Sequence, residues 1–133
     1  MAANVDPIFV VTPRSPGARL TAANTNLDGA TGAYVTLFTA GANGAFFKGI
    51  KAVAEVTTTA GWIAIFKQDA GSGNVELLKV IQVDAKTVGA TVMPWEGGWL
   101  PPEGIVLSAL SVIKCSVRNS ENIAVHLTGG GDY

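Results

Sequence analysis

The chain has 133 residues, of which 48% are hydrophobic and 14% charged, with a formal net charge of −1. This length fits one domain that needs no disulfide support, and the scattered charges argue against binding to nucleic acid or an anionic membrane. So few charges leave two alternatives: part of the surface is covered by a partner, or Ser, Thr, Asn and Gly side chains cover it.

The single cysteine, Cys115, excludes an intrachain disulfide and a cysteine-based metal site, so we expect a buried, inert thiol. The first residues lack the basic start and apolar core of a signal peptide, and no run approaches the roughly 20 apolar residues of a membrane span. We therefore expect a protein made in a cytoplasm.

Residues 1–20 hold three prolines, Pro7, Pro13 and Pro16, around a short apolar run. Because proline donates no backbone hydrogen bond, this segment is either an extended arm or an edge strand. We separate it from a β-sandwich domain over residues 21–133. An arm of this kind can lie on a neighbouring subunit, and the candidate contact residues are Ile8, Phe9, Val10, Pro13 and Arg14.

Turn signals at Asp28-Gly29 and Thr31-Gly32 precede a strand predicted over residues 34–39, and residues 40–44 form the next turn. A meander of three strands is then expected. In the first, residues 45–56, alternation places Phe46, Ile50, Ala52, Ala54 and Val56 on one face. The second, residues 62–68, is apolar on both faces and should lie centrally. The third, residues 75–83, follows a hairpin loop over 69–74.

Beyond Val83, residues 90–93 indicate a short strand, and the Pro- and Gly-rich stretch 94–104 indicates a long loop. Residues 105–113 resume the strand pattern, and whether the strand continues to Val117 is left open. Residues 118–122 read as a polar turn before a last strand over 123–128. Seven or eight short strands predict a single-domain antiparallel β-sandwich, with a jelly roll as the leading topology.

No catalytic residues, cofactor or metal site are predicted. His126 is the only histidine, which is too little for a catalytic triad or a metal cluster. The loop 69–74 lacks the repeated carboxylates of a calcium site and is better explained as a turn. Trp95 and Trp99 flank two glycines, so they either anchor a loop to the core or a subunit, or offer aromatic faces to a glycan.

Several segments together resemble a family of small virion proteins of tailed bacteriophages and prophages. The resemblance follows the order of the chain through 7–14, 21–29, 38–44, 57–61, 100–104 and the ending Gly130-Gly131-Asp132-Tyr133. Residues 110–121 are longer than the equivalent family segment.

The resemblance implies a non-enzymatic capsid decoration, or cement, protein that binds the outer capsid surface and stabilises contacts between major capsid subunits. The implied partners are the major capsid protein and further copies of the chain, as a homotrimer on the virion. The alternative is a receptor- or glycan-binding module of a tail tip or fibre, with Trp95 and Trp99 as its platform.

Overall fold

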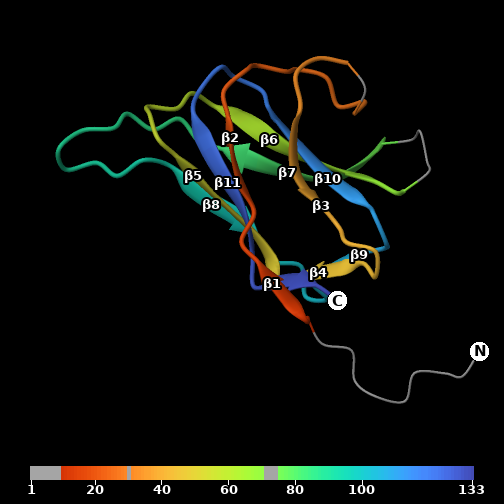
Figure 1. The fold of residues 1–133 in the computed structure, drawn as a ribbon. Helices are drawn as coiled ribbons and strands as arrows, with labels where there is room; N and C mark the ends of the chain where they lie inside the picture. Colours follow the sequence, from red (N-terminus) through yellow and green to blue (C-terminus); the bar gives the residue numbers. More distant parts are fainter. Residues whose placement is uncertain (1–9, 30, 71–74) are drawn as a thin grey trace, which may run out of the picture.

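The structure, a computed structural model, describes residues 10–29, 31–70 and 75–133. In these ranges the chain forms twelve strands and no helix, so the predicted all-β class is confirmed (Figure 1). The strands are β1 (Thr12–Arg14), β2 (Gly17–Leu20), β3 (Val35–Thr39), β4 (Ala45–Phe47), β5 (Gly49–Ala54), β6 (Gly61–Gln68), β7 (Val75–Val83), β8 (Glu96–Trp99), β9 (Ile105–Leu107), β10 (Val112–Val117), β11 (Ile123–Thr128) and β12 (Gly130–Asp132).

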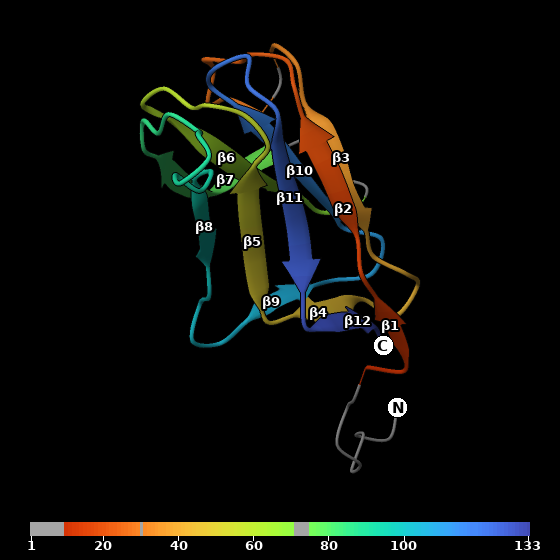
Figure 2. The same ribbon diagram turned by 90° about the vertical axis from the view of Figure 1, so that its left-hand side faces the viewer.

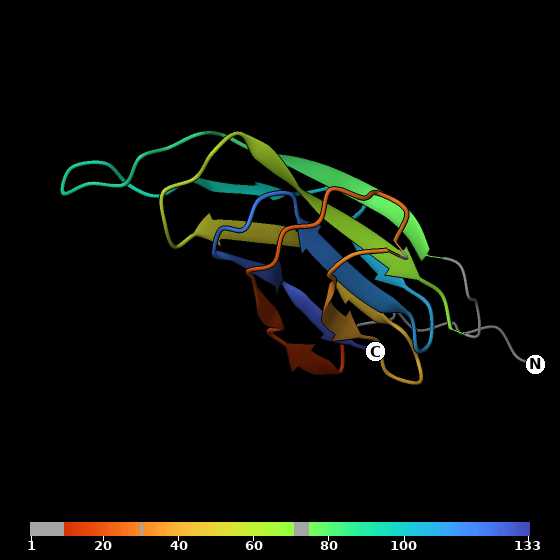
Figure 3. The same cartoon turned by 90° about the horizontal axis from the view of Figure 1, so that it is seen from above.

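The strands form three four-stranded antiparallel sheets. The front sheet has the order β2-β11-β5-β8, the back sheet has the order β3-β10-β6-β7, and the end sheet has the order β1-β12-β4-β9. The front and back sheets face each other as two layers, and the end sheet lies across one end of them (Figure 2). A view from above shows the two layers from their end (Figure 3).

The end sheet continues the front sheet around a corner. Each of its strands is the chain neighbour of the strand at the same place in the front sheet, because β1 leads to β2, β11 to β12, β4 to β5 and β8 to β9. Pro16 and Gly129 lie at two of the bends, and Gly129 has a φ of 69°. A proline and a glycine with positive φ suit a sharp change of strand direction. Counting each continued pair as one strand leaves eight strands in two layers.

These eight strands pair as one long hairpin that is folded across the two layers. β6 pairs with β7 at its tip, and then β5 pairs with β8, β3 with β10 and β2 with β11. Successive pairs alternate between the back sheet and the front sheet. The core between the layers takes side chains from both sheets, including Ile50 and Val125 from the front and Ile63, Ile65 and Ile113 from the back.

The expected strand 45–56 is broken at Lys48, which corrects both its length and its faces. Ala45 and Phe47 are buried in β4, whereas Ile50, Ala52 and Ala54 are buried in β5, so the inward parity changes at the corner. Phe46 was predicted to share a face with Ile50 but is only half-buried on the outer side. An irregularity of one residue moves every later side chain to the opposite face.

The expected meander is also wrong at its first connection. β5 and β6 lie in different sheets, so residues 55–60 cross between layers, and Thr58 bridges to Lys86. The other two predictions for this region are confirmed: β6 is an interior strand with Ile63 to Phe66 buried, and β6 and β7 form an antiparallel hairpin. Residues 71–74 of its loop lie outside the described residues.

Three further boundaries differ from expectation. Residues 90–93 form only an isolated bridge between Gly89 and Val92, and β8 lies inside the stretch expected to be a loop. The strand expected over 105–113 divides into β9 and β10 at a turn where Leu110 has a φ of 60°. β10 does run to Val117, and the glycine-rich ending contributes β12.

Candidate interaction surface

An apolar surface covers the outer side of the end sheet and the loop that enters it. We call it the end surface and define it by Val11, Pro13, Phe46, Leu100 and Val106. Three of these side chains are among the most exposed large hydrophobic groups described, with Val11 at 77%, Leu100 at 74% and Val106 at 63% of full exposure. Exposed apolar side chains that gather in one place, rather than singly, indicate a contact with another molecule.

The register of the end sheet explains why these side chains share a face. Pro13 lies opposite Gly131, Gly131 opposite Phe46, and Phe46 opposite Val106, and paired residues point to the same side. The neighbouring row, with Ala45 opposite Leu107, is buried toward the core. The end surface is therefore one side of a sheet whose other side completes the hydrophobic core.

A groove runs beside Phe46 on this surface. It is a hollow of about 350 Å³ lined by Phe46, Lys48, Leu100, Pro101, Pro102, Glu103 and Gly104. The loop is held as a turn by the Gly104 amide, which donates to the Pro101 carbonyl at 3.0 Å. Gly104 has a φ of 73°, and a Cβ there would come within 2.5 Å of the Phe46 ring. The glycine therefore both permits the turn and keeps the groove open against Phe46. We call this hollow the end groove.

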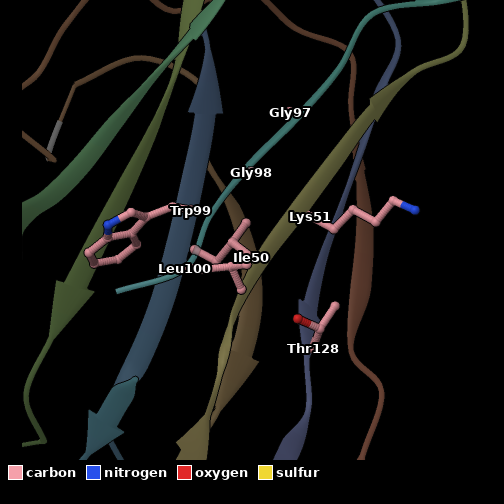
Figure 4. Close-up of a pocket in the computed structure, with 7 residues that line it drawn as sticks. All are labelled: Ile50, Lys51, Gly97, Gly98, Trp99, Leu100 and Thr128. Carbon is pink, nitrogen blue, oxygen red and sulfur yellow. The ribbon is translucent and has the colours of Figure 1, made fainter. Parts of the chain in front are cut away.

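A second hollow of about 480 Å³ adjoins the end groove through Leu100, which lines both (Figure 4). Its other lining residues come from β5, β8 and β11, including Gly97, Gly98 and Trp99. Trp99 packs partly buried against the core, and Trp95 is only 6% exposed within it. The two tryptophans thus do not form the exposed aromatic platform that was one of the alternatives. Trp95 instead anchors its segment to the hydrophobic core, which was the other alternative.

The proline-rich N-terminal residues divide between described and undescribed parts of the chain. Ile8 and Phe9 lie outside the described residues, and Val10 is half-buried. Pro13 is exposed on β1, which is one of the two edge strands of the end sheet. Arg14 is engaged within the fold, because its Nε donates to Asp132 Oδ2 at 2.8 Å. Residues 12–20 accordingly contribute the edge strands β1 and β2.

In the part of the chain that the structure describes, the histidine and the cysteine lie on different sheets, His126 on β11 and Cys115 on β10. His126 is exposed on β11, opposite Gly17 and Lys51 in the register. Cys115 is buried, as predicted, and its burial raises the pKa of the thiol to about 12. Among the residues that the structure describes, no group of three or more His, Cys, Asp and Glu side chains could hold a metal ion.

The sequence pointed to the N-terminal part of the end surface and missed the rest. Leu100 to Gly104 were predicted to be a loop. Val106 belonged to a run that is apolar at almost every position, so no alternation with polar residues indicated that its side chain points outward. The signal that could have found this part is the Leu100-Pro101-Pro102 sequence, because apolar residues next to prolines in a loop are hard to bury.

Comparisons with known proteins add little to this geometry. No protein-family model matches the chain, and no curated protein matches it. One solved structure, of the T13 IBDV viral particle, is similar with a TM-score of 0.31 and 15% sequence identity, over 97% of this chain. The match spans 36% of that viral chain. In the described ranges of the present chain, no helix is long and apolar enough to cross a membrane.

Proposed function

We propose that the chain is a non-enzymatic structural protein of a tailed-bacteriophage virion, and most specifically a capsid decoration protein. Its partners in this proposal are the major capsid protein and further copies of itself, as a homotrimer on the capsid surface. The observation that carries the proposal is the end surface, where exposed Val11, Leu100 and Val106 lie with half-buried Phe46 on the outer side of the end sheet and of the loop that enters it. A decoration protein needs such a self-contained apolar area to bind a lattice.

The strand order supports the architecture expected for this function. Eight antiparallel strands pair first with last, second with seventh, third with sixth and fourth with fifth, in alternating layers. We infer that the fold is a jelly roll, a topology used by viral capsid proteins and lectins among others. Since one fold serves many functions, this order favours the proposal without deciding it.

The resemblance of residues 7–14, 100–104 and the C-terminal ending to phage virion proteins also supports the proposal. All three segments border the end surface, because Pro13 belongs to it, Leu100 to Gly104 line its groove, and Gly131 lies between Pro13 and Phe46 in the sheet. The tail-tip glycan-binding alternative loses its main argument, since Trp95 is in the core.

The proposal can be tested with capsids assembled from the major capsid protein of the same phage. Purified chain is sedimented with these capsids, and the bound fraction is measured over a range of concentrations. Val106→Arg places a charge on the end surface without entering the core, and should weaken binding at least tenfold. That factor equals about 1.4 kcal/mol, which is less than the usual contribution of one buried aliphatic side chain.

The matched control is Leu77→Arg, which makes the same kind of change on β7 of the back sheet, where Leu77 is 44% exposed. We expect this variant to bind capsids as the unchanged chain does. Equal binding by Val106→Arg and Leu77→Arg would exclude the end surface as the capsid contact. No binding by the unchanged chain at any concentration would refute the decoration function.

A further inference from the structure

The end groove is lined mostly by apolar side chains and by two charged ones. Its apolar lining residues are Phe46, Leu100, Pro101 and Pro102, and its charged lining residues are Lys48 and Glu103. A volume of about 350 Å³ is enough for one or two large apolar side chains of a peptide. The groove also adjoins β9, the other edge strand of the end sheet, which can pair with an added extended segment.

The N-terminal segment has the composition that fits this groove. Residues 5–9 read Val-Asp-Pro-Ile-Phe, so two large apolar side chains follow a proline and a single acidic residue. Proline favours an extended backbone and restricts the residue before it, which lowers the entropy lost on binding. Asp6 is the only charged side chain in residues 1–9, and Lys48 in the groove lining has the complementary charge.

The segment leaves the described fold at the edge of the end sheet opposite the groove. The Val11 amide donates to the Asp132 carbonyl at 2.9 Å and so attaches this end of the chain to the β1 edge. The groove lies between β4 and the loop that leads into β9, two to three strands away. Val11 is also displaced from the groove along the strand direction by two to three residues. The register shows this, because Pro13 lies opposite Gly131 and Gly131 lies opposite Phe46.

Chain geometry then argues against occupation by the same copy. With strands about 4.8 Å apart and about 3.4 Å per residue, the groove centre is roughly 15 Å from Val11. In a fully extended chain, the Cα atom of Phe9 lies at most about 7 Å from the Cα atom of Val11, and that of Ile8 at most about 11 Å. The residues between them are β-branched or aromatic and favour an extended backbone over an immediate reversal. A segment from a neighbouring copy meets no such limit.

We propose that Ile8 and Phe9 of one copy occupy the end groove of a neighbouring copy, with Asp6 of the first copy beside Lys48 of the second. This inference rests on the proposed function, since it names the contact between copies on the virion. The contact is heterologous: one surface of each copy meets a different surface of the next. Such a contact closes into a ring, including a trimer, if the rotation between copies allows it.

Two full-length variants test the proposal in combination. The arm variant, Ile8→Asp with Phe9→Asp, keeps an intact groove, and the groove variant, Leu100→Arg, keeps an intact N-terminal segment. Each alone should associate at least tenfold more weakly than the unchanged chain in sedimentation equilibrium over a concentration series. Leu77→Arg serves as the control and should associate normally.

Mixing the two variants makes the test specific. In the mixture, the groove variant still has an intact N-terminal segment and the arm variant still has an intact groove, so one of each can bind. Assembly should therefore stop at a one-to-one dimer of about twice the 13.6 kDa chain mass. A mixture that stays monomeric overturns the proposal, as does an arm variant that associates like the unchanged chain, or an unchanged chain that stays monomeric throughout.

The same variants separate this inference from the proposed function. If Val106→Arg loses capsid binding while self-association is absent or insensitive to both variants, the decoration function stands and the contact between copies is wrong. If the mixture forms its dimer but no variant or unchanged chain binds capsids, the contact between copies stands and the decoration function is wrong.

Discussion

Two buried serines should respond to the same substitution with opposite signs. Ser116 on β10 is 1% exposed, and its Oγ has no hydrogen-bond partner among the described residues. Ser111 is fully buried, and its Oγ lies 2.6 Å from the Ser108 hydroxyl. We therefore expect Ser116→Ala to raise the free energy of unfolding and Ser111→Ala to lower it.

The magnitudes follow from the two environments. A buried hydroxyl without a partner costs about 1–3 kcal/mol, and replacing it with hydrogen removes that cost without creating a large cavity. Ser111→Ala removes a short hydrogen bond and leaves the Ser108 hydroxyl without that partner, which costs about 1 kcal/mol of folding stability. The two variants should thus differ by about 2–4 kcal/mol, although both remove one buried oxygen.

Urea denaturation followed by tryptophan fluorescence measures the difference. The two variants should have the same m-value as the unchanged chain, because the surface exposed on unfolding is nearly the same, and their midpoints should move in opposite directions. A lower midpoint for Ser116→Ala would mean that its hydroxyl makes a favourable interaction in the folded chain, and the reasoning would be refuted.

Three other variants test the corner, a turn and the core. Asp132→Ala should destabilise the fold by about 2 kcal/mol in urea denaturation, because its carboxylate accepts from the Gly41 amide at 2.9 Å and from Arg14 at 2.8 Å; a change below that of Arg14→Ala would contradict this. Leu110→Asn should raise the thermal midpoint by relieving about 1 kcal/mol of strain at a φ of 60°, and an unchanged midpoint would mean no strain. Cys115 should resist thiol reagents until the chain unfolds. Since its pKa is raised from 9.0 to about 12 in the folded state, the native state keeps its proton longer, and stability from this group is lost as pH rises from about 9 to 12; Cys115→Ala should lack that component.

Only part of the end surface could be predicted from the sequence. The prolines near Pro13 predicted an edge strand or an arm, because a missing backbone donor is a property of the residue itself, and β1 and β2 lie at sheet edges. Alternation assigned Phe46 to the face of Ile50, and Val106 could not be assigned to an outer face, since its neighbours on both sides are also apolar. The corner at Lys48 then reversed the face on which alternation alone placed Phe46. Trp95 was ambiguous because a tryptophan in a Pro- and Gly-rich stretch can either anchor that stretch to the core or expose its ring.

Sequence alone determined the all-β class, the position of most strands, the β6–β7 hairpin, and the buried state of Cys115. These features depend on local properties: side-chain alternation, turn residues and the burial preference of a thiol. Only the tertiary structure decided the partners of each strand, the corner that turns the front sheet into the end sheet, and the gathering of Val11, Leu100 and Val106 on one surface. The physical reason is that strand pairing joins residues far apart in the chain, and a period of two carries no information about which distant strand will be the neighbour.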